Sequence, residues 1–429
     1  MSTTLLLVAV VLLAFVVGHL ATRYLSRFVW LSGVEYLAVG ALLGPAFSPR
    51  ILTRETLEAL DPLISLLLGV GGFLVGLTAR RRIAGAERAG VGVLSAATVC
   101  IGLVAIVYPL LSLLFASDGE ALYHLPILTV GPWHLEAHVT GDLLVMTVAV
   151  GAAAACSSAT MLDGDRVLQR ATGEVTTLLR SGAAASQLFG IVAFGLALAA
   201  LRAVDAANRF GISITEWALA ALMSGVVVGL AFALFIGRET DGGRLFLAAV
   251  GAITFASGIG TALGISPLFV NAIAGLVVAS ISPHADAVLE QVDRLQHPLF
   301  VMLMIFAGAM WEPVSGWLWL LPVVYAIVRF VLRRIATTAA ARTVMAEPPA
   351  VRRLGDGLLA QGAIGVAIGI SFAQRAPEKG AAVLTVVVVG MVASDLLAPR
   401  AMRALLHDAG EIPAQTNAAD PDAGKRGTA

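Results

Sequence analysis

Ionisable side chains are rare inside the long apolar runs of this sequence, and those present are the first candidates for chemistry. They are Glu35, Arg180, Arg329, Arg333, Arg334 and Asp395. An arginine at the centre of a membrane helix costs about 2.5–3.5 kcal/mol, so such residues usually mark an ion or substrate pathway. Arg329, Arg333 and Asp395 are the candidates for charge compensation inside the membrane, because the carboxylate of Asp395 could pair with either arginine. The alternatives are snorkelling of the arginines to the interface and an Asp395–Arg400 contact.

The composition predicts a membrane protein. Of 429 residues, 58% are hydrophobic and only 13% are charged, whereas about 25% are charged in an ordinary soluble domain. The net charge is zero, and the absence of a basic stripe argues against nucleic-acid binding. Cys100 and Cys156 have no Cys or His at ligand spacing, so we expect no metal site. Catalytic and cofactor motifs are lacking, which predicts a protein that is neither an enzyme nor a cofactor carrier.

The positions of the apolar runs predict an all-α, polytopic fold with about 13 transmembrane helices. Runs of about 17–25 apolar residues are long enough to cross a bilayer. They lie at 3–22, 28–45, 62–79, 89–116, 142–162, 173–202, 216–236, 244–263, 266–282, 297–312, 316–341, 355–374 and 381–400. We expect one transmembrane domain over residues 1–404, followed by a disordered cytoplasmic tail over residues 405–429.

The distribution of Lys and Arg predicts the orientation. Most of these residues fall in alternate loops, for example Arg80–Arg82, and cytoplasmic loops retain basic residues. This places the N-terminus outside and the C-terminus in the cytoplasm, in a membrane of the bacterial inner (plasma) type. The loop 117–140 contains His124, His134 and His138 but no Lys or Arg, and is expected outside. The first run lacks a preceding basic segment, so we expect a retained helix rather than a cleaved signal peptide.

Two matching segments indicate an internal repeat. Residues 31–43 align without gaps on 265–277, and residues 61–72 align on 297–308. The two segments of each pair are separated by an odd number of predicted helices, so the second copy is inverted in the membrane. Inverted repeats place a binding site near the bilayer midplane, between discontinuous helices of the two copies.

Three segments of the chain resemble a known family. They are LSGVEYLAVGALLGP at Leu31–Pro45, GISPLFVNAIAGLVVAS at Gly264–Ser280 and HPLFVMLMIFAGA at His297–Ala309. They are similar to segments of the monovalent cation:proton antiporters, in the sodium/proton exchanger-like and Kef-type membrane domains. The resemblance implies a homodimer in membrane lipid that exchanges Na⁺ or K⁺ for H⁺. It also implies a core (helices about 89–202 and 316–400) and dimerisation helices (about 3–79 and 244–312).

The resemblance further implies that the fifth and twelfth helices are unwound where they cross. The fifth run contains Ser157, Ser158 and Thr160, and the twelfth contains Gln361 among glycines. Small residues allow close backbone approach, and hydroxyl groups can satisfy the freed backbone. We consider these four residues candidates for ion or substrate binding. The alternative is that small residues only let ordinary helices pack.

The sequence departs from the family at the ion site. The sixth helix of the family carries one or two cation-binding aspartates, but the matching positions here are Ser186 and Gln187. Neutral oxygens can bind a cation, but neither side chain titrates near neutral pH. Arg329 and Arg333 match the Arg and Lys of the family's eleventh helix. We expect no direct competition between proton and cation at one carboxylate of the sixth helix.

Three functions are compatible with these observations. The favoured one is a secondary transporter that exchanges a cation for protons by alternating access, with a non-standard ion site. The second is an anion or organic-solute transporter on the same fold, because the core is rich in arginine. The third is a membrane subunit or sensor that does not transport.

Overall fold

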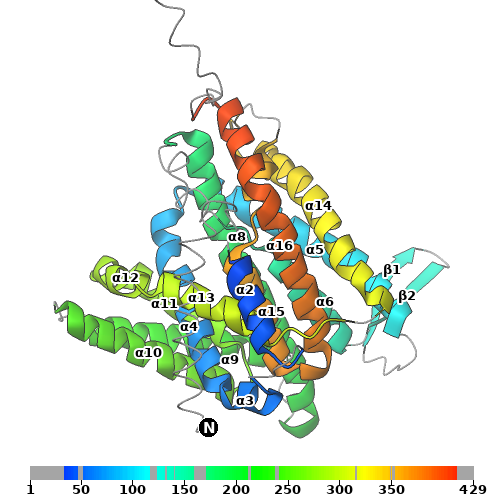
Figure 1. The fold of residues 1–429 in the computed structure, drawn as a ribbon, viewed down its shortest axis with the longest axis horizontal. Helices are drawn as coiled ribbons and strands as arrows, with labels where there is room; N and C mark the ends of the chain where they lie inside the picture. The colour runs from blue at the N-terminus through cyan, green and yellow to red at the C-terminus, as the bar shows by residue number, and fades with distance from the viewer. Residues whose placement is uncertain are drawn as a thin grey trace, which may run out of the picture.

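The computed structural model describes most of the chain. The described residues are 33–46, 52–115, 123–130, 133–139, 141–158, 171–210, 214–236, 241–314, 316–347, 349 and 353–412. Figure 1 shows a bundle of helices with a small hairpin at one corner. The first predicted run, 3–22, lies outside the described residues, as does Thr160.

Each predicted run from the second to the thirteenth corresponds to a helix. These helices are α2 (Val34–Leu43), α4 (Asp61–Arg82), α5 (Ala86–Phe115), α6 (Gly141–Ala155), α8 (Glu174–Phe210), α9 (Ile214–Phe235), α10 (Gly242–Ala262), α11 (Pro267–Ile281), α13 (Gln296–Ala309), α14 (Leu320–Val344), α15 (Gly362–Arg375) and α16 (Pro377–Asp408). Short helices α3 (Arg54–Ala59), α12 (Ala285–Asp293), η2 (Gly316–Trp319) and η3 (Leu354–Leu358) connect them. The predicted all-α membrane fold is confirmed.

By length and apolarity alone, fewer helices qualify as membrane spans than the sequence analysis predicts. Among the described residues, six helices are long and apolar enough to cross a membrane by themselves: α4, α5, α8, α9, α10 and α16. Helices α2, α6, α11 and α13 are apolar but shorter. Helix α14 has 25 residues, but Arg329, Arg333 and Arg334 raise its charge. The interrupted and charged helices are those expected to carry function.

The helices pack as two bundles. The scaffold bundle contains α2, α4, α9, α10, α11 and α13, and the core bundle contains α5, α6, α8, α14, α15 and α16. In the scaffold bundle α2 packs on α13 and α4 packs on α11, which pairs each segment of the first predicted copy with one of the second. A Cβ at Gly40 would overlap the carbonyl of Ile305, and one at Gly308 would overlap the carbonyl of Leu37. Glycine therefore lets α2 and α13 touch along their backbones.

The outer loop predicted at 117–140 contains a β-hairpin. Strand β1 (Tyr123–Val130) pairs antiparallel with β2 (Trp133–Val139), with an irregularity between Pro126 and Leu128. In the view of Figure 1 the hairpin is drawn near the start of α14, far from the C-terminal ends of α14 and α16. This small sheet is an addition to the all-α fold.

The predicted boundary of the tail at residue 405 is too early. Helix α16 continues to Asp408, and Gly410, with φ of 71°, turns the chain back. The carboxylate of Glu411 then accepts from the backbone N–H of Val175 at 2.7 Å and of Thr176 at 2.9 Å. These residues open α8, whose N-cap position is a glycine without a capping side chain. A carboxylate at a helix N-terminus satisfies unpaired donors and complements the helix dipole.

Candidate functional site

Two non-helical segments, 156–158 and 359–361, meet in the core bundle at a place that we call the crossing. Helix α6 ends at Ala155, and α15 begins at Gly362 after the short helix η3. The backbone N–H of Ser158 donates to the carbonyl of Ala360 at 2.8 Å. The hydroxyl of Ser157 donates to the carbonyl of Leu358 at 2.8 Å. Over the described residues, the chain is non-helical at 156–158 and at 359–361, and these two segments contact each other, as the resemblance implies.

Small residues make the crossing possible. Gly362 has φ of 71°, a conformation that residues with a side chain rarely adopt. A Cβ at this position would also lie 2.5 Å from the Cβ of Ser158. On α8, a Cβ at Gly190 would lie 2.6 Å from Sγ of Cys156. The alternative interpretation is that small residues only let ordinary helices pack closely. It does not account for Gly362, whose positive φ lies at the start of α15, where the helix begins anew.

Arg329 caps the freed carbonyls at the crossing. Its Nε donates to the carbonyl of Ala154 at 3.0 Å, and its Nη2 to that of Cys156 at 2.9 Å. Its Nη1 donates to the carbonyl of Leu359 at 2.6 Å and to Oγ of Ser394 at 2.9 Å. One guanidinium thus joins the end of α6, the segment before α15 and helix α16. Because carbonyls carry the negative end of a helix dipole, a cation is stabilising there.

Arg333 acts at the same helix end, one turn further along α14. Its Nη2 donates to the carbonyls of Ala154 at 3.0 Å and Ala155 at 2.5 Å. Its Nη1 donates to Oγ of Ser95 at 3.3 Å. Arg329 and Arg333 are both 0% exposed, so snorkelling to the interface is wrong for both.

Arg334 has a different environment from its two neighbours on α14. Its guanidinium forms a two-point ion pair with the carboxylate of Asp356, in η3. It also lies 4.9 Å from the centre of the Phe330 ring. Its side chain is 36% exposed. Arg334 therefore holds η3 against α14, whereas Arg329 and Arg333 contact the crossing.

Asp395 contacts the other helix end at the crossing, the N-terminus of α15. Its Oδ1 accepts from the backbone N–H of Gln361, the N-cap residue of α15, at 3.0 Å. A carboxylate at the positive end of a helix is stabilising. Asp395 also interacts favourably with Arg329 through their charges. The crossing thus has arginines at its negative helix end and an aspartate at its positive one.

We predict that Asp395→Asn lowers stability more than Glu35→Gln does. Asp395 is 4% exposed and holds the start of α15, whereas Glu35 lies half-buried in α2, away from the crossing. Loss of a charge-assisted bond to a buried amide costs about 1.5–3 kcal/mol. Thermal unfolding in detergent would measure both variants. Equal shifts would contradict the assigned role of Asp395.

Gln361 and Tyr325 form a second buried contact at the crossing. The hydroxyl of Tyr325 lies 3.1 Å from Oε1 of Gln361, and both residues are fully buried. The Nε2 of Gln361 has no hydrogen-bond partner among the described residues. Because amide nitrogen and oxygen can be exchanged by rotation of the amide, this unused atom could equally be an acceptor. A buried polar atom without a partner is suited to a bound ion or water.

Helix α8 places Gln187 at the edge of the core bundle. With about 100° per residue, Gly190 lies roughly 60° to one side of Gln187 and Gly195 roughly 80° to the other. Gly190 faces Ala152 of α6 and Cys156 just after it, whereas Gly195 faces Phe269 of α11. Gln187 therefore points between the crossing and the scaffold bundle and is half-buried.

Ser186 does not face the site in the same way as Gln187. It is fully buried, and its hydroxyl donates to the carbonyl of Ala183 in its own helix at 2.9 Å. Of the two residues at the acidic positions of the family, Gln187 is thus the better placed for an ion.

The structure adds Tyr325 and Thr337, which the sequence analysis did not select. They lie on α14 four residues before Arg329 and four residues after Arg333, and all four side chains are buried. The hydroxyl oxygen of Thr337 lies 2.8 Å from that of Ser95, which contacts Arg333. The fourfold spacing around the two arginines was the available signal. Among the described residues, no group of three His, Cys, Asp or Glu could hold a metal ion.

An all-α membrane bundle with an inverted repeat and two crossed, interrupted helices defines the antiporter-like class of folds. The solved structure of the sodium proton antiporter MjNhaP1 from Methanocaldococcus jannaschii has this fold. The match covers 94% of this chain and 100% of that chain, with a TM-score of 0.64 and 14% sequence identity. No family model and no curated protein sequence matches the chain. The likeness therefore establishes the sodium/proton antiporter-like fold.

Proposed function

We propose that the protein is a secondary transporter that exchanges a monovalent cation, Na⁺ or K⁺, for protons by alternating access. The observation that carries the proposal is the crossing of α6 and α15, with both helix ends neutralised by buried charges. Such discontinuous helices form ion sites in transporters, because unwound backbone offers carbonyl oxygens inside the membrane. The fold is shared with a protein described as a sodium proton antiporter.

The ion site that we propose is built from neutral groups. Gln187 borders the crossing from α8, and Ser157, Ser158 and Gln361 lie in it. Their oxygens suit a monovalent cation, but they do not titrate near neutral pH. In this proposal a group other than the side chains at 186 and 187 carries the proton.

Anion or organic-solute transport is the second candidate. The contacts of Arg329 argue against it, whereas Nε of Arg333 has no hydrogen-bond partner among the described residues. Arg329 and Arg333 are two fully buried positive charges in the core bundle, which also contains the buried carboxylate of Asp395. However, Arg329 uses its Nε, Nη1 and Nη2 on protein oxygens. Its hydrogen-bonding capacity is thus largely committed to the helix ends.

We also propose the placement of the protein. It lies in a bacterial-type inner membrane with its N-terminus outside and its C-terminus in the cytoplasm, as the basic loops predict. It assembles as a homodimer through the scaffold bundle, as in the sequence-based expectation.

Proteoliposomes with imposed pH and cation gradients test the transport proposal. We expect Na⁺ or K⁺ to drive proton movement, and Gln361→Leu to reduce the rate about ten-fold or more, because a buried polar ligand is lost. Gln296→Leu is the matched control, since Gln296 is exposed at the start of α13. Flux that depends on anions alone would favour the second candidate. Absence of any flux in folded protein would favour a non-transporting subunit or sensor.

A further inference from the structure

The last turns of α15 are tied to the scaffold bundle by polar side chains. Nε2 of Gln374 donates to Oδ1 of Asp61, at the start of α4, over 3.1 Å. It also lies 3.4 Å from Oγ of Ser65, one turn further along α4. One turn earlier on α15, the hydroxyl oxygens of Ser371 and Ser266 are 2.8 Å apart, and both residues are fully buried. These contacts join α15 of the core bundle to α4 and α11 of the scaffold bundle.

Arg375 adds a contact to the turn between α10 and α11. Its Nη2 donates to the carbonyl of Ile265 at 3.1 Å. This turn is fixed by Gly264, whose φ is 69°. The end of α15 is thus held at two places on the scaffold bundle, the start of α4 and the start of α11.

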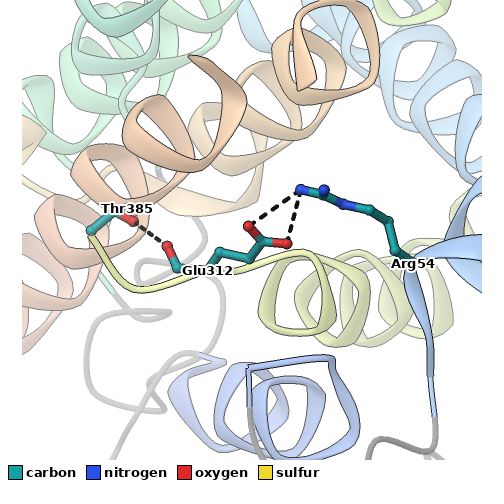
Figure 2. Close-up of polar contacts among 3 residues, drawn as sticks. All are labelled: Arg54, Glu312 and Thr385. Carbon is teal, nitrogen blue, oxygen red and sulfur yellow. Dashed lines mark hydrogen bonds and ion pairs between the residues drawn. The ribbon is translucent and has the colours of Figure 1, made fainter. Parts of the chain in front are cut away.

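A second set of contacts, drawn in Figure 2, lies between the same two bundles. Nη2 of Arg54, in α3, lies 3.1 Å and 3.3 Å from the two carboxylate oxygens of Glu312. The backbone carbonyl of Glu312 accepts from Oγ1 of Thr385, in α16, at 3.3 Å. Glu312 follows α13, so it connects the scaffold bundle with the core bundle. The side chain of Arg54 is 67% exposed and that of Glu312 is 41% exposed, and ion pairs that water reaches contribute little stability.

These contacts lie where α15 ends and where α4 and α16 begin. The predicted topology places this end of the helices outside. The core bundle cannot separate from the scaffold bundle here while Gln374 is bound to Asp61. We propose that the Gln374–Asp61 contact is a gate that keeps the path between the two bundles closed at this end. This inference rests on the proposed alternating-access function.

The chemistry of the pair suits a contact that must form and break. An amide donating to a carboxylate is stronger than a bond between neutral groups, but weaker than a buried ion pair. Gln374 and Asp61 are both half-buried, so water can replace either partner when the bundles separate. The buried Ser371–Ser266 pair lies behind them and separates only after they do.

Cysteine labelling tests the gate without any measurement of transport. Ser65→Cys places a thiol behind the Gln374–Asp61 contact, at a position that is 5% exposed. A charged, membrane-impermeant maleimide is added from one side or the other of oriented vesicles. We expect Gln374→Leu to speed labelling from the outside about ten-fold, because one charge-assisted bond is lost. Gln374→Glu should speed it more, because two carboxylates then face each other.

An exchange of the two groups provides the decisive control. Asp61→Asn combined with Gln374→Glu restores an amide–carboxylate pair in the opposite direction, and should return labelling to the slow rate. Glu58→Gln removes an exposed charge from the neighbouring helix α3 and should change nothing. The native Cys100 and Cys156 are buried and give the background rate.

Two results would overturn the gate. One is labelling of residue 65 at the same rate in the parent and in both Gln374 variants. The other is faster labelling from the cytoplasmic side only. Failure of the gate is distinguishable from failure of the proposed function, because labelling needs no ion flux. Faster labelling in a protein that moves no ions would support the gate and contradict the transport proposal.

Discussion

Gln187→Asp is expected to create or strengthen cation exchange that depends on pH. The side chain at this position points between the α6–α15 crossing and the scaffold bundle. An aspartate there would bind a cation when ionised and release it when protonated, which the native amide cannot do. A charge-assisted contact is worth about 1.5–3 kcal/mol, so the apparent Kd for the cation should fall roughly ten- to hundred-fold at high pH. Cation-driven proton movement in proteoliposomes measures this effect.

Gln187→Asn is the matched control for this experiment. Asparagine has the size and shape of aspartate but does not titrate. If both variants show the same pH profile, the effect comes from shortening the side chain. An unchanged pH profile in folded Gln187→Asp would show that this position does not face the ion.

Arg329→Met is expected to lower the free energy of unfolding by about 3–5 kcal/mol, comparable with the loss of one partner from a buried ion pair. The side chain is fully buried and donates to the carbonyls of Ala154, Cys156 and Leu359. Methionine fills similar space but removes a donor from each of these carbonyls. Nη2 of Arg333 still donates to the carbonyls of Ala154 and Cys156, so the carbonyl of Leu359 is the most affected, and an unsatisfied buried group costs about 1–3 kcal/mol. Thermal or denaturant unfolding in detergent measures the loss.

Arg342→Met controls for the substitution itself. Arg342 lies on the same helix but is exposed near its end, so its replacement should change stability by less than about 0.5 kcal/mol. Arg329→Lys should be intermediate, because one ammonium group retains the charge but cannot reach three separated carbonyls. If Arg329→Met unfolds like Arg342→Met, the arginine does not stabilise the crossing.

The α14 helix illustrates how much of the site was predictable. Tyr325, Arg329, Arg333 and Thr337 form one buried stripe. Val323, Ile327, Val331 and Ile335 form another, between 46% and 63% exposed. Both stripes have a spacing of four residues, so a helical projection of the sequence separates the polar face from the lipid-facing one. The sequence analysis selects the two arginines for their charge, and their spacing also points to Tyr325 and Thr337 on the same face.

The partners of the arginines could not be predicted in the same way. Arg329 and Ala154 are 175 positions apart in the chain. The carbonyl of Ala154 is available only because α6 ends there, and it is reached only because α14 packs alongside. Sequence analysis therefore favoured a carboxylate, Asp395, as the obvious opposite charge. In the structure, most acceptors of the two arginines are backbone carbonyl oxygens of residues 154–156 and 359.

The β-hairpin was missed for a different reason. The segments 123–130 and 133–139 are separated by the two residues Gly131 and Pro132, and the second alternates polar and apolar side chains as WHLEAHV. This pattern is a hairpin signal. It was overlooked because the loop was considered only as a connection between helices.

The carboxylate of Glu411 has a mechanical consequence for the two long helices beside the crossing. It binds the first turn of α8 from a position just beyond the end of α16. Buried Ile412 packs with the apolar residues of both helices. The start of α8 and the end of α16 are therefore fastened to each other by both polar and apolar contacts. We expect Glu411→Ala to loosen this attachment, which hydrogen exchange at the first turn of α8 would measure.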